Sequence, residues 1–137
     1  MSDERQAGRS EGYSILVVDD SPVMRTFIRR VLELTGLPAK QVLEADDGQS
    51  ALDTLGTTKI DLILSDVNMP GMNGPEFLRR LSMEPALSAI PVLVVSTDSS
   101  RQRVDSMIKL GARGYIQKPF HPELLRDELR RVLEIEA

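Results

Sequence analysis

Several short runs that contain apolar residues are followed in this chain by residues whose side chains can bind cations or phosphate groups. These residues are Asp19, Asp20, Asp66, Ser96 and Lys118. Three carboxylates held together repel one another, and a hard divalent cation relieves that repulsion. Ligands that offer only oxygen favour Mg²⁺. A hydroxyl and an ammonium on the far side of such a cation could hold the remaining oxygens of a phosphoryl group.

The apolar runs before these residues predict β-strands. Residues 15–18, 62–64 and 92–95 are short, rich in β-branched side chains and bounded by polar residues, which is typical of strands buried on both faces. Residues 41–45 and 114–117 mix polar and apolar positions. We therefore expect the first three runs in the middle of a sheet and the other two at its edges.

Amphipathic segments between and after these runs predict helices. They cover residues 22–35, 48–55 and 74–83, a segment that ends at Gly111, and residues 122–135. Ser21 before Pro22 is typical of a helix start. The spacings from Asn73 to Glu76 and from Ser99 to Gln102 predict capping boxes at two others.

A strand and a helix thus alternate five times. That pattern favours an α/β fold with one parallel sheet, right-handed crossovers and helices on both faces. With the apolar strands central, the strand order is 2-1-3-4-5, the flavodoxin-like doubly wound arrangement. Ligands in such sheets bind beyond the carboxyl ends of the strands, so the polar groups should converge there. A carboxylate can be a nucleophile in phosphoryl transfer, and Asp66 is favoured because its strand lies between the acidic pair and Ser96.

Each residue taken singly also has an ordinary structural interpretation. Asp20 or Ser21 could serve only as a helix cap, and Asp66 or Ser96 could simply begin a turn. Lys118 alone is typical of a solvated surface lysine. The functional hypothesis depends on the combination of suitable groups at four strand ends.

Composition excludes several classes of site. The 137 residues suit one domain, with a disordered tail over residues 1–12 and the domain over 13–137. The absence of cysteine excludes disulfides and thiolate chemistry, and the single histidine, His121, excludes a multi-histidine metal centre. The net charge of −4 argues against binding DNA. Without an apolar signal core or a run of about 20 apolar residues, we expect a cytoplasmic protein that does not enter the membrane.

Four motifs in this order resemble the receiver domain of two-component response regulators, in particular stand-alone chemotaxis regulators. They are ILVVDDS at 15–21, DVNMPGMNG at 66–74, PVLVVS at 91–96 and GARGYIQKPF at 111–120. The resemblance extends from about Ser14 to Val132, so it covers nearly the whole chain outside the tail. It implies a phosphorylatable signalling switch.

The resemblance implies roles for the acidic residues. Asp66 would be the phospho-acceptor. Asp20 and Asp66 would bind Mg²⁺ or Mn²⁺ through their side chains, Asn68 would add its backbone carbonyl, and Asp19 would act mainly through water. Asn68 and Asp98, two residues after the acceptor and the hydroxyl, would tune the lifetime of the phosphate.

The resemblance also implies how the switch operates. Ser96 and Lys118 would contact the phosphoryl oxygens, Lys118 would pair with Asp66 beforehand, and the Lys118–Pro119 bond would be cis. Phosphorylation would draw the Ser96 hydroxyl inward and let Tyr115 turn toward the core. The face formed by the fourth helix, the fifth strand and the fifth helix would then change its affinity for a protein partner.

The expected partners are a sensor histidine kinase, which donates the phosphoryl group from a phosphohistidine, and an output protein. We expect slow autodephosphorylation rather than enzymatic turnover, and a monomer or a phosphorylation-dependent dimer. The chain stops soon after its last amphipathic stripe, so we expect no DNA-binding domain within it.

Three other hypotheses remain open at this point. A phosphatase with an aspartyl nucleophile would place a general acid where Asn68 stands, and an amide cannot serve as one. A flavin- or nucleotide-binding module lacks support because no glycine-rich phosphate loop follows the first strand. A receiver-like interaction module that never takes phosphate would be expected to lack part of the acidic set, which is complete here.

Overall fold

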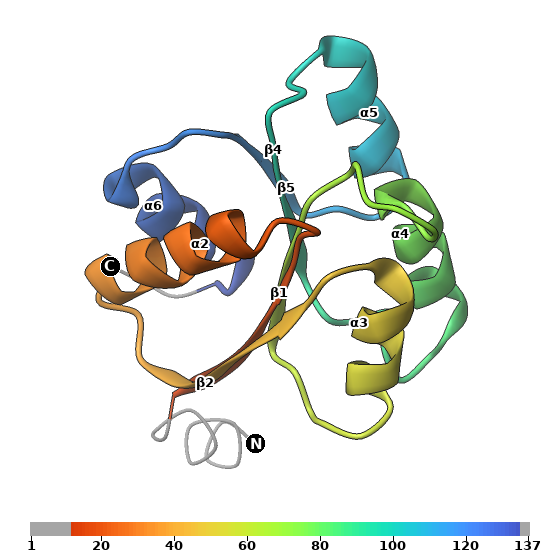
Figure 1. Ribbon diagram of the computed structural model, residues 1–137, viewed down its shortest axis with the longest axis horizontal. Coiled ribbons are helices and arrows are strands. Elements are labelled where there is room, and N and C mark those ends of the chain that lie inside the picture. Colours follow the sequence, from red (N-terminus) through yellow and green to blue (C-terminus); the bar gives the residue numbers. More distant parts are fainter. Residues whose placement is uncertain (1–11, 135–137) are drawn as a thin grey trace.

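Five strands and five helices alternate in the computed structural model, which describes residues 12–134 (Figure 1). The strands are β1 (Tyr13–Val18), β2 (Ala39–Ala45), β3 (Leu62–Ser65), β4 (Val92–Ser96) and β5 (Gly114–Gln117). The helices are α2 (Pro22–Leu34), α3 (Gly48–Leu55), α4 (Gly74–Met83), α5 (Arg101–Lys109) and α6 (Pro122–Val132). All ten predicted elements are therefore present.

The strands form one parallel sheet in the order β2-β1-β3-β4-β5, which confirms the predicted topology. Every residue of β1, β3 and β4 is buried, whereas most residues of β2 and half of those of β5 are at least partly exposed. The cause is position in the sheet, because only the edge strands border solvent. β2 begins two residues earlier than predicted, since the backbone N–H of Tyr13 already donates to the Pro38 carbonyl and Tyr13 pairs with Ala39.

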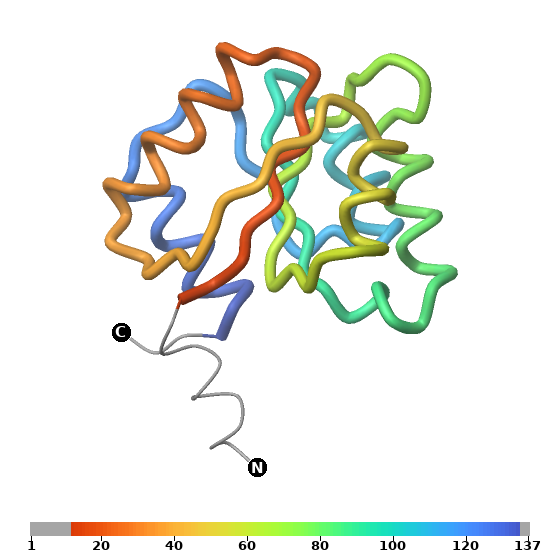
Figure 2. Tube along the Cα trace, turned by 60° about the horizontal axis from the view of Figure 1, so that its bottom comes forward, coloured from red at the N-terminus to blue at the C-terminus, as the bar shows by residue number. Residues whose placement is uncertain are grey.

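Two helical layers cover the sheet. Figure 2 shows α2 and α6 on one side and α3, α4 and α5 on the other. Successive side chains of β1 point to opposite faces, so Ile15 and Val17 pack in the core beneath α2 and α6 while Leu16 and Val18 pack in the core on the other side. Both cores bury the central strands, and the loops at the carboxyl ends of these strands carry the polar residues.

Helix caps fix where the chain leaves these loops. The side chains of Ser21 and Asn73 accept hydrogen bonds from the backbone N–H groups of Met24 and Glu76, at 3.2 and 3.0 Å, so both predicted caps are confirmed. The Glu76 carboxylate pairs with Arg79 and Arg80, and only the Asn73 half of the predicted capping box forms. The prediction of Ser99 as a cap is wrong by one residue. Ser100 is the N-cap of α5 instead, because the Asp98 carboxylate accepts from the backbone N–H of Ser100 and carries the turn one residue further.

The predicted tail falls outside the described residues except for Gly12. Gly12 is buried with φ +96, and a Cβ there would lie 2.7 Å from the backbone nitrogen of Lys40. Within residues 12–134, no helix has the length and apolar character that crossing a membrane requires.

Candidate functional site

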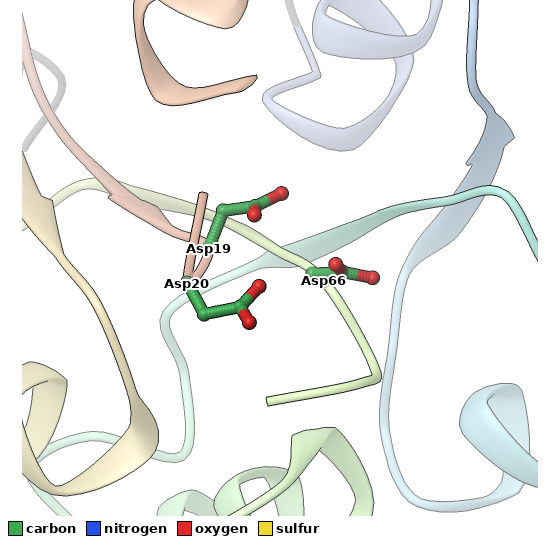
Figure 3. A group of neighbouring side chains, drawn as sticks. All are labelled: Asp19, Asp20 and Asp66. Carbon is green, nitrogen blue, oxygen red and sulfur yellow. The ribbon is translucent and has the colours of Figure 1, made fainter. Parts of the chain in front are cut away.

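Three carboxylates meet where β1 and β3 end. Asp19 and Asp20 directly follow β1, and Asp66 directly follows β3, whose Ser65 is paired with Val18. One oxygen from each of the three carboxylates lies within 4.8 Å of the others, and Figure 3 shows the three side chains gathered at this point. Asp19 and Asp66 are buried while Asp20 is exposed. The cluster is therefore open to solvent on the Asp20 side.

Lys118 brings a buried positive charge to this cluster. Its Nζ lies 3.0 Å from Asp19 Oδ2 and 3.4 Å from Asp66 Oδ2, and the side chain is only 7% exposed. The lysine therefore pairs with Asp66 but lies nearer to Asp19. The backbone N–H of Lys118 donates to the Ser96 carbonyl, and the Lys118–Pro119 bond is cis, as the resemblance implied. A buried ammonium needs such partners, because an unpaired charge away from water is very costly.

Backbone hydrogen bonds orient the two buried carboxylates. Asp19 Oδ1 accepts from the backbone N–H of Ser21 at 2.9 Å, and Asp66 Oδ1 accepts from the backbone N–H of Val67 at 2.7 Å. In both residues Oδ2 is the oxygen that contacts Lys118. Each carboxylate thus has one oxygen that accepts from the main chain and one that faces the Lys118 ammonium, which the two carboxylates share.

Ser96, Asp98 and Tyr115 form a hydrogen-bonded chain that leads away from the acidic cluster. Ser96 is fully buried at the end of β4, and its hydroxyl accepts from the backbone N–H of Asp98 at 3.1 Å. The Asp98 carbonyl in turn accepts from the hydroxyl of Tyr115 on β5. The strand end that adjoins the site is therefore connected to the edge strand through two hydrogen bonds.

Asp98 and Tyr115, the two titratable residues in this series of hydrogen bonds, have shifted pKa values. Burial raises the pKa of the half-buried Tyr115 phenol, although the nearby Ser96 side chain acts in the opposite direction. The pKa of Asp98 is lowered, mainly because its carboxylate accepts a hydrogen bond from the backbone N–H of Ser100. Asn68 is exposed in the loop after Asp66.

Comparison with known proteins identifies the family. Residues 15–130 match the model of the response regulator receiver domain. The chain belongs to this family. This receiver domain is 35% identical over 120 residues to the chemotaxis protein CheY of Pseudomonas aeruginosa, which covers 88% of the chain and 95% of the relative.

Solved receiver structures have the same fold. The chemotaxis response regulator CheY4 of Vibrio cholerae superimposes on this receiver domain with a TM-score of 0.78 at 36% identity, covering 88% of this chain and 98% of that one. The receiver domain of the sensor histidine kinase PA1611 from P. aeruginosa PAO1, which has a magnesium ion coordinated in its active-site cleft, gives a TM-score of 0.78 at 25% identity and covers 90% and 98%.

Family membership sets the class of function. Receiver domains of the CheY type are phosphorylatable signalling switches of two-component systems rather than turnover enzymes. The prediction of a response-regulator switch is therefore confirmed, and the family assignment does not support the phosphatase and flavin-module alternatives.

One residue beside the site escaped the sequence analysis. The guanidinium of Arg25, on α2, donates to the main-chain carbonyl of Asp19 and to the carboxylate of Glu44. The only signal in the sequence was its place one turn beyond the helix cap Ser21, close to the end of β1.

Proposed function

We propose that Asp66 accepts a phosphoryl group from the phosphohistidine of a sensor histidine kinase, in a reaction that needs Mg²⁺ or Mn²⁺. The observation that carries this proposal is the position of Asp66, whose carboxylate lies within 4.8 Å of those of Asp19 and Asp20 and pairs with the Lys118 ammonium. A nucleophile in that position can attack phosphorus while the neighbouring positive charge neutralises the negative charge on the phosphoryl oxygens.

The donor set fits a hard divalent cation. Asp19, Asp20 and Asp66 offer only carboxylate oxygens, which Mg²⁺ prefers, and the exposed Asp20 leaves the cluster accessible. The backbone carbonyl of Asn68 would add a neutral ligand. When bound, the cation neutralises the clustered carboxylates and draws the phosphoryl oxygens toward them. The magnesium ion in the related PA1611 receiver domain supports this assignment.

The residues of this chain divide the chemistry between them. A carboxylate oxygen of Asp66 forms a bond to phosphorus as the phosphorus–nitrogen bond of the donor breaks. The bonding electrons stay with the donor imidazole nitrogen. The Lys118 ammonium and the Ser96 hydroxyl hold the equatorial oxygens in which negative charge is concentrated. The same site hydrolyses the acyl phosphate slowly, and Asn68 and Asp98 tune that rate by obstructing or orienting the attacking water.

The switch acts through the chain formed by Ser96, Asp98 and Tyr115. In the unphosphorylated protein the Ser96 hydroxyl accepts a hydrogen bond from the backbone N–H of Asp98. A phosphoryl group on Asp66 draws this hydroxyl away from that N–H and toward the phosphoryl oxygens. The Asp98 carbonyl accepts a hydrogen bond from the Tyr115 hydroxyl. Movement of the backbone at Asp98 therefore changes the relative populations of the Tyr115 side-chain orientations on β5. The face formed by α5, β5 and α6 then changes its affinity for an output protein, and Ile108 of α5 and Leu124 of α6 each have an exposed apolar side chain.

Incubation with acetyl phosphate and Mg²⁺, followed by intact-mass spectrometry, tests the acceptor. We expect one phosphoryl adduct on the unaltered chain, none on Asp66→Asn, and an undiminished adduct on Asp53→Asn, which changes an exposed aspartate of α3. Chelation with EDTA should prevent the adduct. Phosphoramidate, which has the phosphorus–nitrogen bond of a phosphohistidine, should serve as an alternative donor. Absence of any adduct would favour the module that never takes phosphate.

A further inference from the structure

Arg25 joins three parts of the molecule beside the acidic cluster. From its place on α2 it reaches Glu44 of the edge strand β2, with Nε 2.7 Å from Glu44 Oε1. Its Nη1 donates to the main-chain carbonyl of Asp19, where β1 ends. The Arg25 side chain is only 15% exposed. An arginine fork held at two points in a mostly buried position restrains both of its acceptors.

The carbonyl that Arg25 holds belongs to the peptide that joins Asp19 to Asp20. That peptide is planar, so holding its oxygen fixes the orientation of the whole unit up to the Cα of Asp20. Asp19 has further restraints through its backbone N–H, which donates to Ala45, and through its carboxylate. Within residues 12–134, by contrast, the carboxylate of the exposed Asp20 makes no hydrogen bond or ion pair. The direction in which this carboxylate points therefore depends on how the backbone on either side of Asp20 is held, by Arg25 at the Asp19 carbonyl and by the bond from the Ser21 N–H to Asp19 Oδ1.

We propose that Arg25 is a positioning residue for the divalent cation site, which acts by fixing the peptide that carries Asp20. The inference rests on the proposed function of the acidic cluster. It assigns to Arg25 a role in cation affinity that its charge alone would not suggest. A positive charge near a cation site weakens binding by repulsion, whereas a positioning residue strengthens it.

Substitution of Arg25 by lysine separates geometry from charge. Arg25→Lys keeps the positive charge, but a single ammonium on a flexible stem cannot reproduce the fork that binds Glu44 and Asp19 together. Arg29 offers a matched control, because it lies one turn further along α2, with Nη1 3.4 Å from Glu44 Oε2, and donates to the Val42 carbonyl without contacting the acidic cluster. The parallel pair Arg25→Met and Arg29→Met removes the charge as well.

The test measures Mn²⁺ binding to the full chain by electron paramagnetic resonance and by calorimetry, with circular dichroism to monitor the fold. We expect Arg25→Lys and Arg25→Met to bind Mn²⁺ about tenfold more weakly than the unaltered chain. Arg29→Lys should match the unaltered chain, and Arg29→Met should bind equally or more tightly. Weakening by Arg25→Met is the decisive sign, since loss of the repelling charge alone would tighten binding.

Several outcomes would overturn the inference. Unchanged affinity in Arg25→Lys, or tighter binding in Arg25→Met, would show that the guanidinium acts only through its charge or not at all. Unfolding of both Arg25 variants while the Arg29 variants fold would identify Arg25 as a structural residue. Failure of the unaltered chain to bind Mn²⁺ would instead contradict the proposed function, so the two failures are distinguishable.

Discussion

Lys118 supplies a permanent positive charge next to the buried carboxylates of Asp19 and Asp66. Its ammonium is nearly inaccessible to solvent and contacts Asp19 and Asp66 at 3.0 and 3.4 Å. Without it, two buried carboxylates would face one another with no balancing charge, which the interior of a protein tolerates poorly. The lysine is therefore expected to stabilise the fold before any divalent cation binds.

Replacement of this lysine should expose that role. Without divalent cations, Lys118→Met should lower the free energy of unfolding by about 3 kcal/mol, the usual effect of breaking a buried ion pair. Saturating Mg²⁺ should reduce the deficit, because a cation bound at the acidic cluster replaces the charge that the variant lacks and so stabilises the variant more than the unaltered chain. Urea denaturation followed by circular dichroism measures both values. Lys109→Met, at an exposed position of α5, should change stability by no more than about 0.5 kcal/mol. A deficit that Mg²⁺ leaves unchanged would contradict this account.

Tyr115 gives a second prediction for a single residue. Burial raises the pKa of its phenol, so the folded chain keeps this proton at a pH where the unfolded chain, with a tyrosine pKa of about 10, has lost it. Stability should accordingly fall as the pH rises above about 10, and it should fall less steeply in Tyr115→Phe. Ultraviolet difference titration of the two proteins would place the Tyr115 transition. A transition at or below the usual value would show that burial does not govern this side chain.

At the scale of elements, the loop between β3 and α4 sets the position of Asp66. Gly74 begins α4, and its backbone N–H donates to the Val67 carbonyl at 2.9 Å. A Cβ on Gly74 would lie 2.6 Å from Val67 Cα and 3.0 Å from the Asp66 carbonyl oxygen. The start of this helix therefore packs directly on the backbone that carries the acceptor, and only glycine permits that approach.

An alanine at position 74 should disturb both stability and chemistry. Gly74→Ala should lower the free energy of unfolding by about 1–3 kcal/mol, the usual cost of overpacking, and should slow adduct formation with acetyl phosphate by displacing Asp66. Gly56→Ala is the matched control. Its Cβ would meet nothing closer than 3.4 Å and its φ is −73, so stability should stay constant or rise by up to about 1 kcal/mol. Equal effects of the two substitutions would refute a special role for the contact at Gly74.

At the scale of the whole molecule, the site exists only in the folded chain. Lys118 is 99 residues from Asp19 and 52 from Asp66 along the sequence, and parallel pairing of β1, β3, β4 and β5 brings them together. An unfolded chain cannot hold these groups at bonding distance. Cation binding and folding are therefore linked.

This linkage predicts how Mg²⁺ affects stability. Above the dissociation constant, each tenfold rise in Mg²⁺ should add about 1.4 kcal/mol to the free energy of unfolding. Asp20→Asn should flatten this dependence, while Asp53→Asn, which lies outside the site, should preserve it. Denaturant titrations at a series of Mg²⁺ concentrations provide the measurement. A slope that is the same in Asp20→Asn and in the unaltered chain would show that the cation stabilises the protein elsewhere.

The sequence alone determined the order of the elements, the assignment of central and edge strands and the types of side chain at the strand ends. Each of these features depends on a few residues that are neighbours in the sequence. Uninterrupted apolar runs predicted the buried strands β1, β3 and β4, and Ser21 and Asn73 predicted two helix starts from chemistry that acts within three residues. The parallel topology then placed the acids at one end of the sheet.

Only the tertiary structure decided which of these groups touch. It placed Lys118 nearer to Asp19 than to Asp66, moved the cap of α5 from Ser99 to Ser100, and brought Arg25 to the Asp19 carbonyl. Such contacts depend on strand register and on rotamers selected by packing between segments that lie far apart in the sequence. A pattern within a few residues specifies the type of a side chain and the face on which it lies, whereas its bonding partner is specified by the packed molecule.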